Sequence, residues 1–368
     1  MGKDTVHVRK VLLLAPQMEA RGTSAYTVNL ARELQESEVD VGVFCVPGPS
    51  QAVLAREGVP TQVFDRLSGL GFRLARGRFL GAVEEFAPQL VHAQSYRATT
   101  ALKLLNRRTD AALLLTIHGM PASRRSLRRL SRGLDGIIAT TQSVREGLVN
   151  QCKVNRRKIQ VIHNGIDVDS VPEDAIPPPF QGRSPVVGSV GPVEERRGHE
   201  LFAQAAAILV RGGSTAQFVI AGMGEELPEL RKLVGRLGLE RYMTIATDFA
   251  EYEEVLGALD VVVQSSLVDV SGFSILEAMG YQRPVIAFNT GTACEMIEDS
   301  RTGLLVPKGD VEALADAIRS LITDKERAQQ MGRAARESVR EKFNVRTLAR
   351  DTLQFYGEVL SGRASSTE

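Results

Sequence analysis

The stretch that decides the fold is ALDVVVQSSLVDVSGFSILEAMGYQRP, residues 258–284. Its run Val261–Val263 is apolar and β-branched without alternation, which predicts a strand that is covered on both faces. The following SILEAMGY has apolar residues at helical spacing, and a proline lies beyond it. The segment Asp269–Gly272 is therefore expected to leave the carboxyl end of a parallel strand and to enter a helix.

The position of this loop predicts a ligand site. Open α/β sheets bind ligands outside the carboxyl ends of their strands, and a helix N-terminus offers free N–H groups and partial positive charge to an anion. Glu277 lies about one turn into the helix, where a carboxylate can accept hydrogen bonds from sugar hydroxyls. A phosphorylated, hydroxyl-rich ligand is expected. The alternative is that Asp269 is an ordinary loop acid and Glu277 an exposed helix residue.

Strands and helices alternate in two blocks, separated by a proline-rich stretch at 172–185. The expected strands are VLLLAP, VGVFCVP, LVHAQ, LLLTIH and GIIATT in the first block, and PVVGSVG, QFVIAGMG, VVVQSS, PVIAFN and GLLVP in the second. This α/β pattern predicts two Rossmann-like domains that face each other across a cleft. We expect them at 1–176 and 177–345, followed by a C-terminal helix and disordered tail at 346–368.

Composition excludes several classes of protein. The chain has 368 residues, 43% of them hydrophobic, and no apolar run approaches the ~20 residues of a membrane span. No signal-peptide core precedes the first strand. The three cysteines, Cys45, Cys152 and Cys294, are too few and too scattered for a disulfide framework or a zinc site. A reducing cytoplasmic location is expected.

Familiar nucleotide and metal motifs are missing. The chain has no G-x-G-x-x-G after a first strand, no Walker pattern and no H-E-x-x-H. The lone G-x-G at Gly222–Gly224 is a weak signal. Asp167 and Asp169 could chelate a metal, but they lie beside HNGI, which fits the end of the first domain better. We expect no metal and no cofactor.

Charge is distributed unevenly. Residues 1–180 hold 24 Lys and Arg against 17 Asp and Glu, whereas the remainder holds 21 against 27. Much of the excess lies in Arg124–Arg132, where Leu127 and Leu130 would give a helix a narrow apolar edge among five arginines. The segment fits either a solvated basic face or contact with an anionic membrane surface or acidic acceptor. Nucleic acid is not expected, because no binding motif accompanies the charge.

Ordered motifs spanning residues 9–345 resemble the group 1 (family 4) glycosyltransferases of the GT-B fold class. They are LVHAQ, LLLTIHGM, VIHNGIDVD, VGSVGPVEERRGHELFAQAAAIL, FVIAGMGEELPELRKL, LDVVVQSSLVDVSGFSILEAMGYQRPVIAFNTG and EMIEDSRTGLLVPKGDVEALADAI. The set is specific, although no single piece is decisive.

The resemblance implies a nucleotide-sugar donor bound by the second domain. The E-x7-E motif of the family matches Asp269 and Glu277, with a conservative departure at the first position. Glu277 would accept the ribose hydroxyls, Asp269 would face the donor sugar, and amides near Gly272 and Phe273 would hold phosphate and sugar. Other donor residues implied by the resemblance are Ser271, Gly222 and, at the nucleotide base, Asp248 and Phe249.

In the first domain, His118 of TIHG matches the family's histidine near the anomeric carbon. It could instead be a core-edge histidine bonded to the backbone, and we expect His92 and His163 to be structural. The loop after the first strand, at Gly22 and Thr23, matches the family's phosphate or acceptor loop. Arg21 stands where the family usually has a second glycine, which could narrow this entrance.

The larger departure is in GPVEERRG. The family usually shows Gly-Arg-x-x-x-Lys-Gly, whose Arg and Lys clamp the donor diphosphate. Here Pro192 replaces the Arg and Arg197 replaces the Lys. Arg197 can supply a fixed charge and a bidentate fork, whereas Pro192 supplies neither.

The resemblance therefore implies a retaining, metal-independent glycosyltransferase with a catalytic set of His118, Asp269 and Arg197. Its acceptor would be a glycan, a lipid-linked or a small molecule, with peripheral contact to the inner face of the membrane through Arg124–Arg132. Two alternatives stay open: a catalytically weak or inactive relative, favoured by Pro192 and Arg21, and another two-domain nucleotide-sugar enzyme such as an epimerase or phosphorylase. The sequence names neither the sugar, the base, the acceptor nor the oligomeric state.

Overall fold

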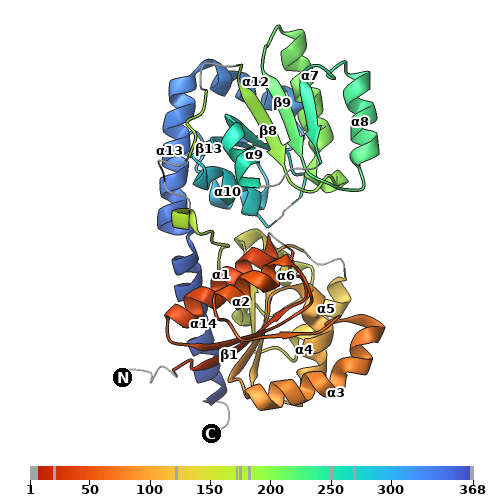
Figure 1. Ribbon diagram of the computed structural model, residues 1–368, viewed down its shortest axis with the longest axis vertical. Helices are drawn as coiled ribbons and strands as arrows, with labels where there is room; N and C mark the ends of the chain where they lie inside the picture. The colour runs from red at the N-terminus through yellow and green to blue at the C-terminus, as the bar shows by residue number, and fades with distance from the viewer. Residues whose placement is uncertain are drawn as a thin grey trace. The chain divides into compact units, whose positions relative to one another are not determined.

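The computed structural model describes residues 7–19, 22–120, 123–170, 173, 176–180, 184–247, 252–268 and 271–364. The chain forms two compact units, one of residues 1–165 and 345–368 and the other of residues 166–344 (Figure 1). It enters the second unit between Gly165 and Ile166 and leaves it between Asn344 and Val345. The boundary thus lies before the proline-rich stretch, whereas the sequence placed it within that stretch.

The first unit contains a parallel sheet in the order β3-β2-β1-β4-β5-β6-β7. Unbroken apolar runs such as LLLA in β1 and ALLLTI in β5 are buried throughout, as expected for strands that are covered on both faces. The strands are β1 Lys10–Ala15, β2 Asp40–Cys45, β3 Thr61–Val63, β4 Leu90–Ala93, β5 Ala112–Ile117, β6 Gly136–Ala139 and β7 Ile159–Val161.

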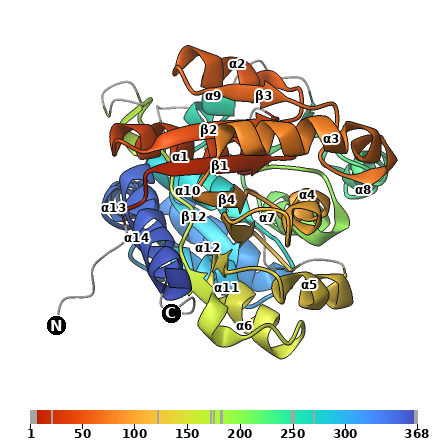
Figure 2. The same cartoon turned by 90° about the horizontal axis from the view of Figure 1, so that it is seen from below.

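Helices cover both faces of this sheet. Side chains of α3, α4, α5 and α6 pack against the strands in one apolar cluster, and α14 lies beside α1 (Figure 2). The helices are α1 Thr23–Glu36, α2 Pro49–Arg56, α3 Gly69–Phe86, α4 Thr99–Leu105, α5 Arg124–Ser131, α6 Gln142–Asn150 and α14 Val345–Ala364, with short 3-10 turns η1 Tyr96–Ala98 and η2 Arg156–Lys158.

The second unit repeats the design with a parallel sheet in the order β10-β9-β8-β11-β12-β13. Its strands are β8 Val186–Val190, β9 Gln217–Ala221, β10 Met243–Ala246, β11 Val261–Gln264, β12 Val285–Phe288 and β13 Gly303–Val306. Its helices are α7 His199–Arg211, α8 Leu227–Arg236, α9 Tyr252–Ala258, α10 Phe273–Gly280, α11 Gly291–Met296, α12 Val311–Thr323 and α13 Lys325–Lys342, with the turns η3 Val168–Ser170 and η5 Glu195–Arg197.

The predicted class, two Rossmann-like domains, is confirmed, and each expected strand is present. The sequence missed β3, β7 and β10, which are short strands at or near the sheet edges. The sequence also predicted a disordered tail for GRASSTE, residues 362–368, whereas Gly362, Arg363 and Ala364 belong to α14. In the described part of the chain, every helix is too short or too polar to cross a membrane.

Candidate functional site

The strand order of the second unit reverses at β8, which pairs with β9 on one side and β11 on the other. Ligands of open α/β sheets bind at such a switch point, beyond the carboxyl ends of the strands. The segments 191–198 and 265–268 leave β8 and β11 there, and Arg197 lies on the first of them, whereas Ser271 and Gly272 directly precede α10. The predicted residues Asp269, Asp248 and Phe249 lie outside the described residues.

Hydrogen bonds tie these two loops together. The Ser265 hydroxyl donates to the carbonyl of Gly198 at 2.8 Å, and the Leu267 amide donates to the carbonyl of Arg196 at 3.0 Å. Ser265 and Leu267 follow β11, whereas Arg196 and Gly198 follow β8. The loop that carries Arg197 is therefore fixed directly against the loop that leads toward α10.

Gly222 holds the loop after β9 close to the loop after β8. A Cβ built on Gly222 would lie 1.9 Å from the carbonyl oxygen of Gly191, so only glycine fits. The amide of Gly191 in turn donates to the carbonyl of Ala221 at 3.0 Å. The predicted residue Gly222 thus shapes the edge of the site through backbone packing.

Arg197 and Pro192 occupy different environments. Arg197 is 9% exposed, and its guanidinium lies against the backbone of Gly191, where Nη2 would be 2.3 Å from an added Cβ. Pro192 is exposed and carries no charge. The loop after β8 therefore presents one buried, positioned cation where the family usually has two cations.

His199, which the sequence analysis missed, closes this loop. Its Nε2 bonds the carbonyl of Pro192 at 3.1 Å, and its Nδ1 bonds the hydroxyl of Ser189 on β8 at 3.2 Å. Burial lowers the pKa of His199 to about 4, so the imidazole is neutral at neutral pH. The only sequence signal was a histidine directly after a loop glycine, because its partners are met only when the loop folds back.

Helix α10 starts at Gly272, which has a φ of 77°. The positive φ favours glycine, and a Cβ there would lie 2.4 Å from Cε at the flexible end of Met296, which would have to shift. Phe273 is buried and Glu277 is partly exposed. The Gln264 side-chain amide at the end of β11 donates to the hydroxyl of Ser274, in the first turn. This bond joins the first turn of α10 to the carboxyl end of β11.

In the first unit, His118 directly follows β5. Its Nε2 bonds the carbonyl of Gln94 at 3.0 Å, and Tyr26 of α1 packs edge-on against its ring at 5.0 Å. Burial lowers the pKa of His118 to about 4, with the bonds to Gln94 and to the Asn164 side chain acting in the opposite direction. The ring is thus a neutral, fixed group at a carboxyl edge.

Two other histidines of this unit, His92 and His163, make structural contacts. His92 is fully buried and bonds Tyr356 of α14 at 2.6 Å and Thr116 of β5 at 2.7 Å. His163 bonds the carbonyl of Thr140 at 3.0 Å. Gly22 and Thr23 lie at the start of α1, and the Gly22 carbonyl accepts the amide of Tyr26.

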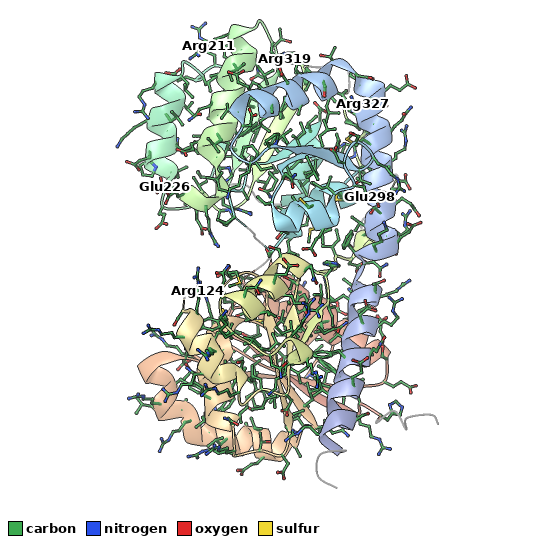
Figure 3. All side chains as sticks on the ribbon, turned by 180° about the vertical axis from the view of Figure 1, so that it is seen from behind. Arg124, Arg211, Glu226, Glu298, Arg319 and Arg327 are labelled. Atoms are coloured by element: carbon green, nitrogen blue, oxygen red, sulfur yellow. The ribbon has the colours of Figure 1, made fainter. Side chains whose placement is uncertain are left out.

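The basic segment forms helix α5, and its apolar edge is not available to a membrane. Leu127 and Leu130 are buried in the core of the first unit, whereas the five arginines are exposed. Arg124 projects from the surface of its unit (Figure 3). The expected narrow apolar edge among five arginines is present, and it packs into the core of the first unit.

Asp167 and Asp169 have structural partners. The Asp167 carboxylate accepts the amide of Ser170 at 3.2 Å, and Asp169 pairs with Arg340 at 3.6 Å. No group of three or more His, Cys, Asp or Glu in the described ranges could hold a metal ion.

Comparison with known proteins adds family evidence. The model for "Glycosyl transferases group 1" matches residues 171–338, and the model for "Glycosyltransferase Family 4" matches residues 20–170. An alpha-D-kanosaminyltransferase of Streptomyces kanamyceticus is 34% identical over 178 residues, 48% of this chain and 46% of that protein. A GDP-mannose-dependent alpha-(1-6)-phosphatidylinositol monomannoside mannosyltransferase of Mycobacterium tuberculosis is 29% identical over 286 residues, 71% of this chain and 74% of that protein. The chain thus spans under half of one relative and about three quarters of the other.

Solved structures share the fold at lower identity. A glycosyltransferase from Rickettsia africae ESF-5 superposes with a TM-score of 0.82 at 20% identity, covering 96% of this chain and 99% of that chain. The Anabaena protein Alr3699/HepE in complex with UDP-glucose superposes with a TM-score of 0.81 at 21% identity, covering 96% and 99%.

Proposed function

The chain belongs to the group 1 glycosyltransferases, and on this basis we propose that it moves a sugar from a nucleotide-sugar donor to a glycan, lipid-linked or small-molecule acceptor. One observation carries the proposal: at the switch point of the second unit, Arg197 and the start of α10 are held on two loops that bond to each other. A buried cation and a helix N-terminus beside a partly exposed carboxylate suit a diphosphate joined to a ribose.

The donor roles follow from these positions. The amides at Gly272 and Phe273 would hold the phosphate and sugar, because a helix N-terminus carries partial positive charge. Arg197 would hold the diphosphate with its fork. Glu277 would accept the ribose hydroxyls, and Asp269 would face the sugar by its place in the family motif.

The proposed reaction retains the configuration of the sugar and needs no metal. The bond from the anomeric carbon to the diphosphate oxygen breaks, and a bond to the acceptor oxygen forms on the same face. The acceptor proton passes to the leaving diphosphate. The protein would contribute positioning and stabilisation of the charge on the leaving group. His118, neutral at neutral pH, would contribute a hydrogen-bonding group and not a second cation.

The relatives indicate the range of acceptors and donors. Their names include a 2-deoxystreptamine glucosyltransferase, a phosphatidylinositol monomannoside mannosyltransferase and a glycogen synthase, which name a small-molecule, a lipid-linked and a glycan acceptor. One uses GDP-mannose, and the Anabaena structure holds UDP-glucose. Donor base, sugar and acceptor are therefore proposed only as classes.

The deciding experiment incubates the protein with UDP-, GDP-, ADP- and dTDP-sugars, with and without candidate acceptors, and measures the released nucleoside diphosphate. Glu277→Ala should abolish transfer and weaken nucleotide binding by calorimetry while the protein stays folded. Glu312→Ala, at an exposed position on α12 of the same unit, is the matched control and should behave as wild type. Unchanged nucleotide affinity in Glu277→Ala would refute the assignment of the donor site.

Nucleotide binding without release under any pairing would favour the catalytically weak relative, the second function that the sequence left open. Pro192 is the specific observation behind it, since the loop offers one positioned cation in place of two. Conversion of a donor without an acceptor, to a sugar phosphate or an isomeric nucleotide sugar, would favour a phosphorylase or an epimerase.

We further propose that the first unit meets an anionic membrane through the face that α3 and α5 share. Residues 66–132 hold 13 Lys and Arg against 3 Asp and Glu. Both helices pack in the same apolar cluster, on one face of the sheet. Leu74 of α3 is 92% exposed, next to the exposed Arg73. Contact through α5 would be electrostatic, because its leucines are buried, whereas Leu74 could enter the interface.

Vesicles that contain phosphatidylglycerol would test this proposal. Replacing Arg124, Arg125, Arg128 and Arg129 with Ser should reduce binding by about 1 kcal/mol per residue, and the effect should fall at high salt. The control removes four exposed arginines of the second unit, Arg211, Arg231, Arg319 and Arg327 (three of them labelled in Figure 3). No binding of wild type at low salt, or equal losses in both variants, would overturn the membrane assignment.

A further inference from the structure

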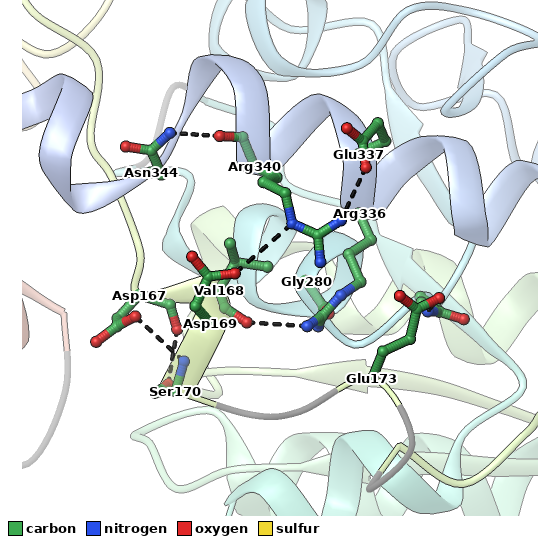
Figure 4. A network of polar contacts seen from close by, with 11 residues as sticks. Asp167, Val168, Asp169, Ser170, Glu173, Gly280, Arg336, Glu337, Arg340 and Asn344 are labelled. Atoms are coloured by element: carbon green, nitrogen blue, oxygen red, sulfur yellow. Dashed lines mark hydrogen bonds and ion pairs between the residues drawn. The ribbon is translucent and has the colours of Figure 1, made fainter.

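Arg336 of α13 is a buried cation that bonds two separate parts of the second unit. Its side chain is 3% exposed. Nη1 donates to the carbonyl of Gly280, the last residue of α10, and Nη2 donates to the carbonyl of Val168 at 3.0 Å (Figure 4). One guanidinium thus joins the C-terminal end of α10 to the segment 166–170.

The end of α10 also packs directly on this segment. A Cβ built on Gly280 would lie 2.9 Å from Cδ1 of Ile166 and 3.8 Å from Cγ2 of Val168. The last carbonyls of a helix have no partner within the helix and carry partial negative charge, so a fixed cation there is favourable. Arg336 therefore satisfies the opposite end of the helix whose N-terminus is the proposed phosphate site.

The segment 166–170 is where the chain enters the second unit. The Ile166 amide donates to the carbonyl of Phe343 at 2.9 Å, and Ile166 forms a parallel bridge with Asn344. Ile166 and Asn344 are the first and last residues of this unit. The segment is therefore fixed to the other chain crossing as well as to α10.

Arg340 lies one turn further along α13 and provides an internal comparison. Its guanidinium pairs with Asp169 at 3.6 Å and with Glu337 at 2.9 Å. Those partners are exposed carboxylates, not carbonyls of α10 (Figure 4). Burial, with the nearby charge of Arg340, lowers the pKa of Arg336, whereas Glu173 and Asp169 act in the opposite direction.

We propose that Arg336 is a positioning residue for the donor site, which holds α10 in place from its C-terminal end and couples donor occupancy at its N-terminal end to the segment 166–170. The identity of the ligand in this inference rests on the proposed function. The Arg336 contacts that carry the inference do not depend on it. Movement of α10 toward a bound diphosphate would shift the Gly280 carbonyl, and through Arg336 the Val168 carbonyl. Coupling of this kind needs a physical link that both ends share, and the guanidinium supplies one.

The test compares Arg336→Gln with the matched control Arg340→Gln by hydrogen–deuterium exchange. Without ligand, Arg336→Gln should speed exchange in peptides that cover 274–283 and 164–170, whereas Arg340→Gln should leave 274–283 unchanged. With saturating UDP or GDP, residues 164–170 of the wild type should become more protected from exchange. In Arg336→Gln they should not, even when the ligand protects the peptide that covers α10. Arg336→Lys keeps the charge but cannot donate to two carbonyls in the same geometry, so it should recover part of the ligand-dependent protection. This variant replaces Arg336→Gln in the test if the latter does not fold.

Binding provides the second measurement. Arg336→Gln should weaken nucleoside diphosphate affinity about tenfold, the order expected for losing hydrogen bonds from a charged group, and should raise KM for the donor more than it lowers kcat. Equal affinity in both variants, or no ligand-dependent protection at 164–170 in wild type, would overturn the inference while the proposed function stands. Should wild type bind no nucleotide, the proposed function fails, and exchange without ligand still decides whether Arg336 holds α10.

Discussion

Two glycines, Gly22 and Gly198, occupy corresponding places in the two units. Each follows the first strand of its unit and caps the next helix, and their φ angles are 64° and 63°. Their surroundings differ. A Cβ on Gly198 would lie 2.2 Å from the carbonyl oxygen of Ser265, whereas a Cβ on Gly22 would meet no atom within 4 Å among the residues that the structure describes.

The difference separates two reasons for the same residue. Both positions need glycine for a positive φ, but only Gly198 also needs it for space. The loop in the second unit is therefore closed against its neighbour, as suits a donor part that relatives with different acceptors share. No atom of the described residues occupies the Cβ position at Gly22, where the proposed acceptor would approach.

The largest effect is expected for Gly198→Ala. Left-handed strain and overpacking against Ser265 should together cost about 2–5 kcal/mol. Gly238→Ala is the control, because Gly238 has a φ of 70° in the same unit but an open Cβ position, so it should show the strain alone. Hydrogen exchange of β8 and α7 amides would measure both. Equal destabilisation of Gly198→Ala and Gly238→Ala would mean that the loop moves away from Ser265 at little cost and is not tightly packed there.

Arg197→Ala tests the closed loop through its chemistry. Because Pro192 carries no charge, Arg197 should provide most of the side-chain stabilisation of the diphosphate. Its loss should lower kcat/KM, by an amount that corresponds to about 2–4 kcal/mol of transition-state stabilisation. Arg197→Lys should recover part of this, since an ammonium lacks the fork. Pro192→Arg should be neutral or raise activity. Near-normal kcat/KM in Arg197→Ala would show that another cation holds the phosphate.

The stability of the two units should depend differently on acid pH. Burial lowers the pKa of His92 to about 3 and those of His118 and His199 to about 4, below the ordinary 6.5. As the pH falls below 6.5, these histidines take up protons in the unfolded state but not in the folded state. The stabilising contribution is therefore full above pH 6.5 and decreases until the pH reaches the pKa of the folded state. Each histidine contributes about 1.4 kcal/mol per pH unit.

The first unit holds two of these histidines, His92 and His118, and should lose stability about twice as steeply as the second, which holds His199. Hydrogen exchange corrected for intrinsic rates, from pH 7 to 4.5, would compare β5 with β8. His92→Gln should flatten the profile of the first unit alone. Parallel profiles in wild type would contradict the assignment of these pKa values.

Local patterns were enough for the fold and for part of the site. The start of α10 was predictable because a β-branched strand, a glycine and an apolar helix face occur within 25 or so residues, about the span of one β-loop-α unit. Arg197 was identified because its departure from the family pattern is visible in the sequence itself.

The remainder depends on contacts between residues that are distant in the sequence. His92 meets Tyr356 across 264 positions, which places α14 in the first unit. His199, the first residue of α7, contacts the loop after β8 only because Pro192 folds back to it. The boundary at 165 was missed because no composition change marks it; it is defined by the pairing of Ile166 with Phe343 and Asn344.

The smallest effect on stability is expected for Gly22→Ala. This variant also tests whether the acceptor binds beside Gly22. With no clash to add, the cost should be the strain of a positive φ alone, about 1 kcal/mol of the stability of the first unit. Gly58→Ala is the matched control, because Gly58 has a φ of 70° and an open Cβ position but lies after α2, away from the start of α1. The two variants should be equally destabilised. If the space at Gly22 admits the acceptor, only Gly22→Ala should raise KM for the acceptor, while its affinity for the nucleotide stays that of wild type. Equal acceptor KM in the two variants would mean that the acceptor binds elsewhere, and that the contrast with Gly198 concerns packing and not substrate entry.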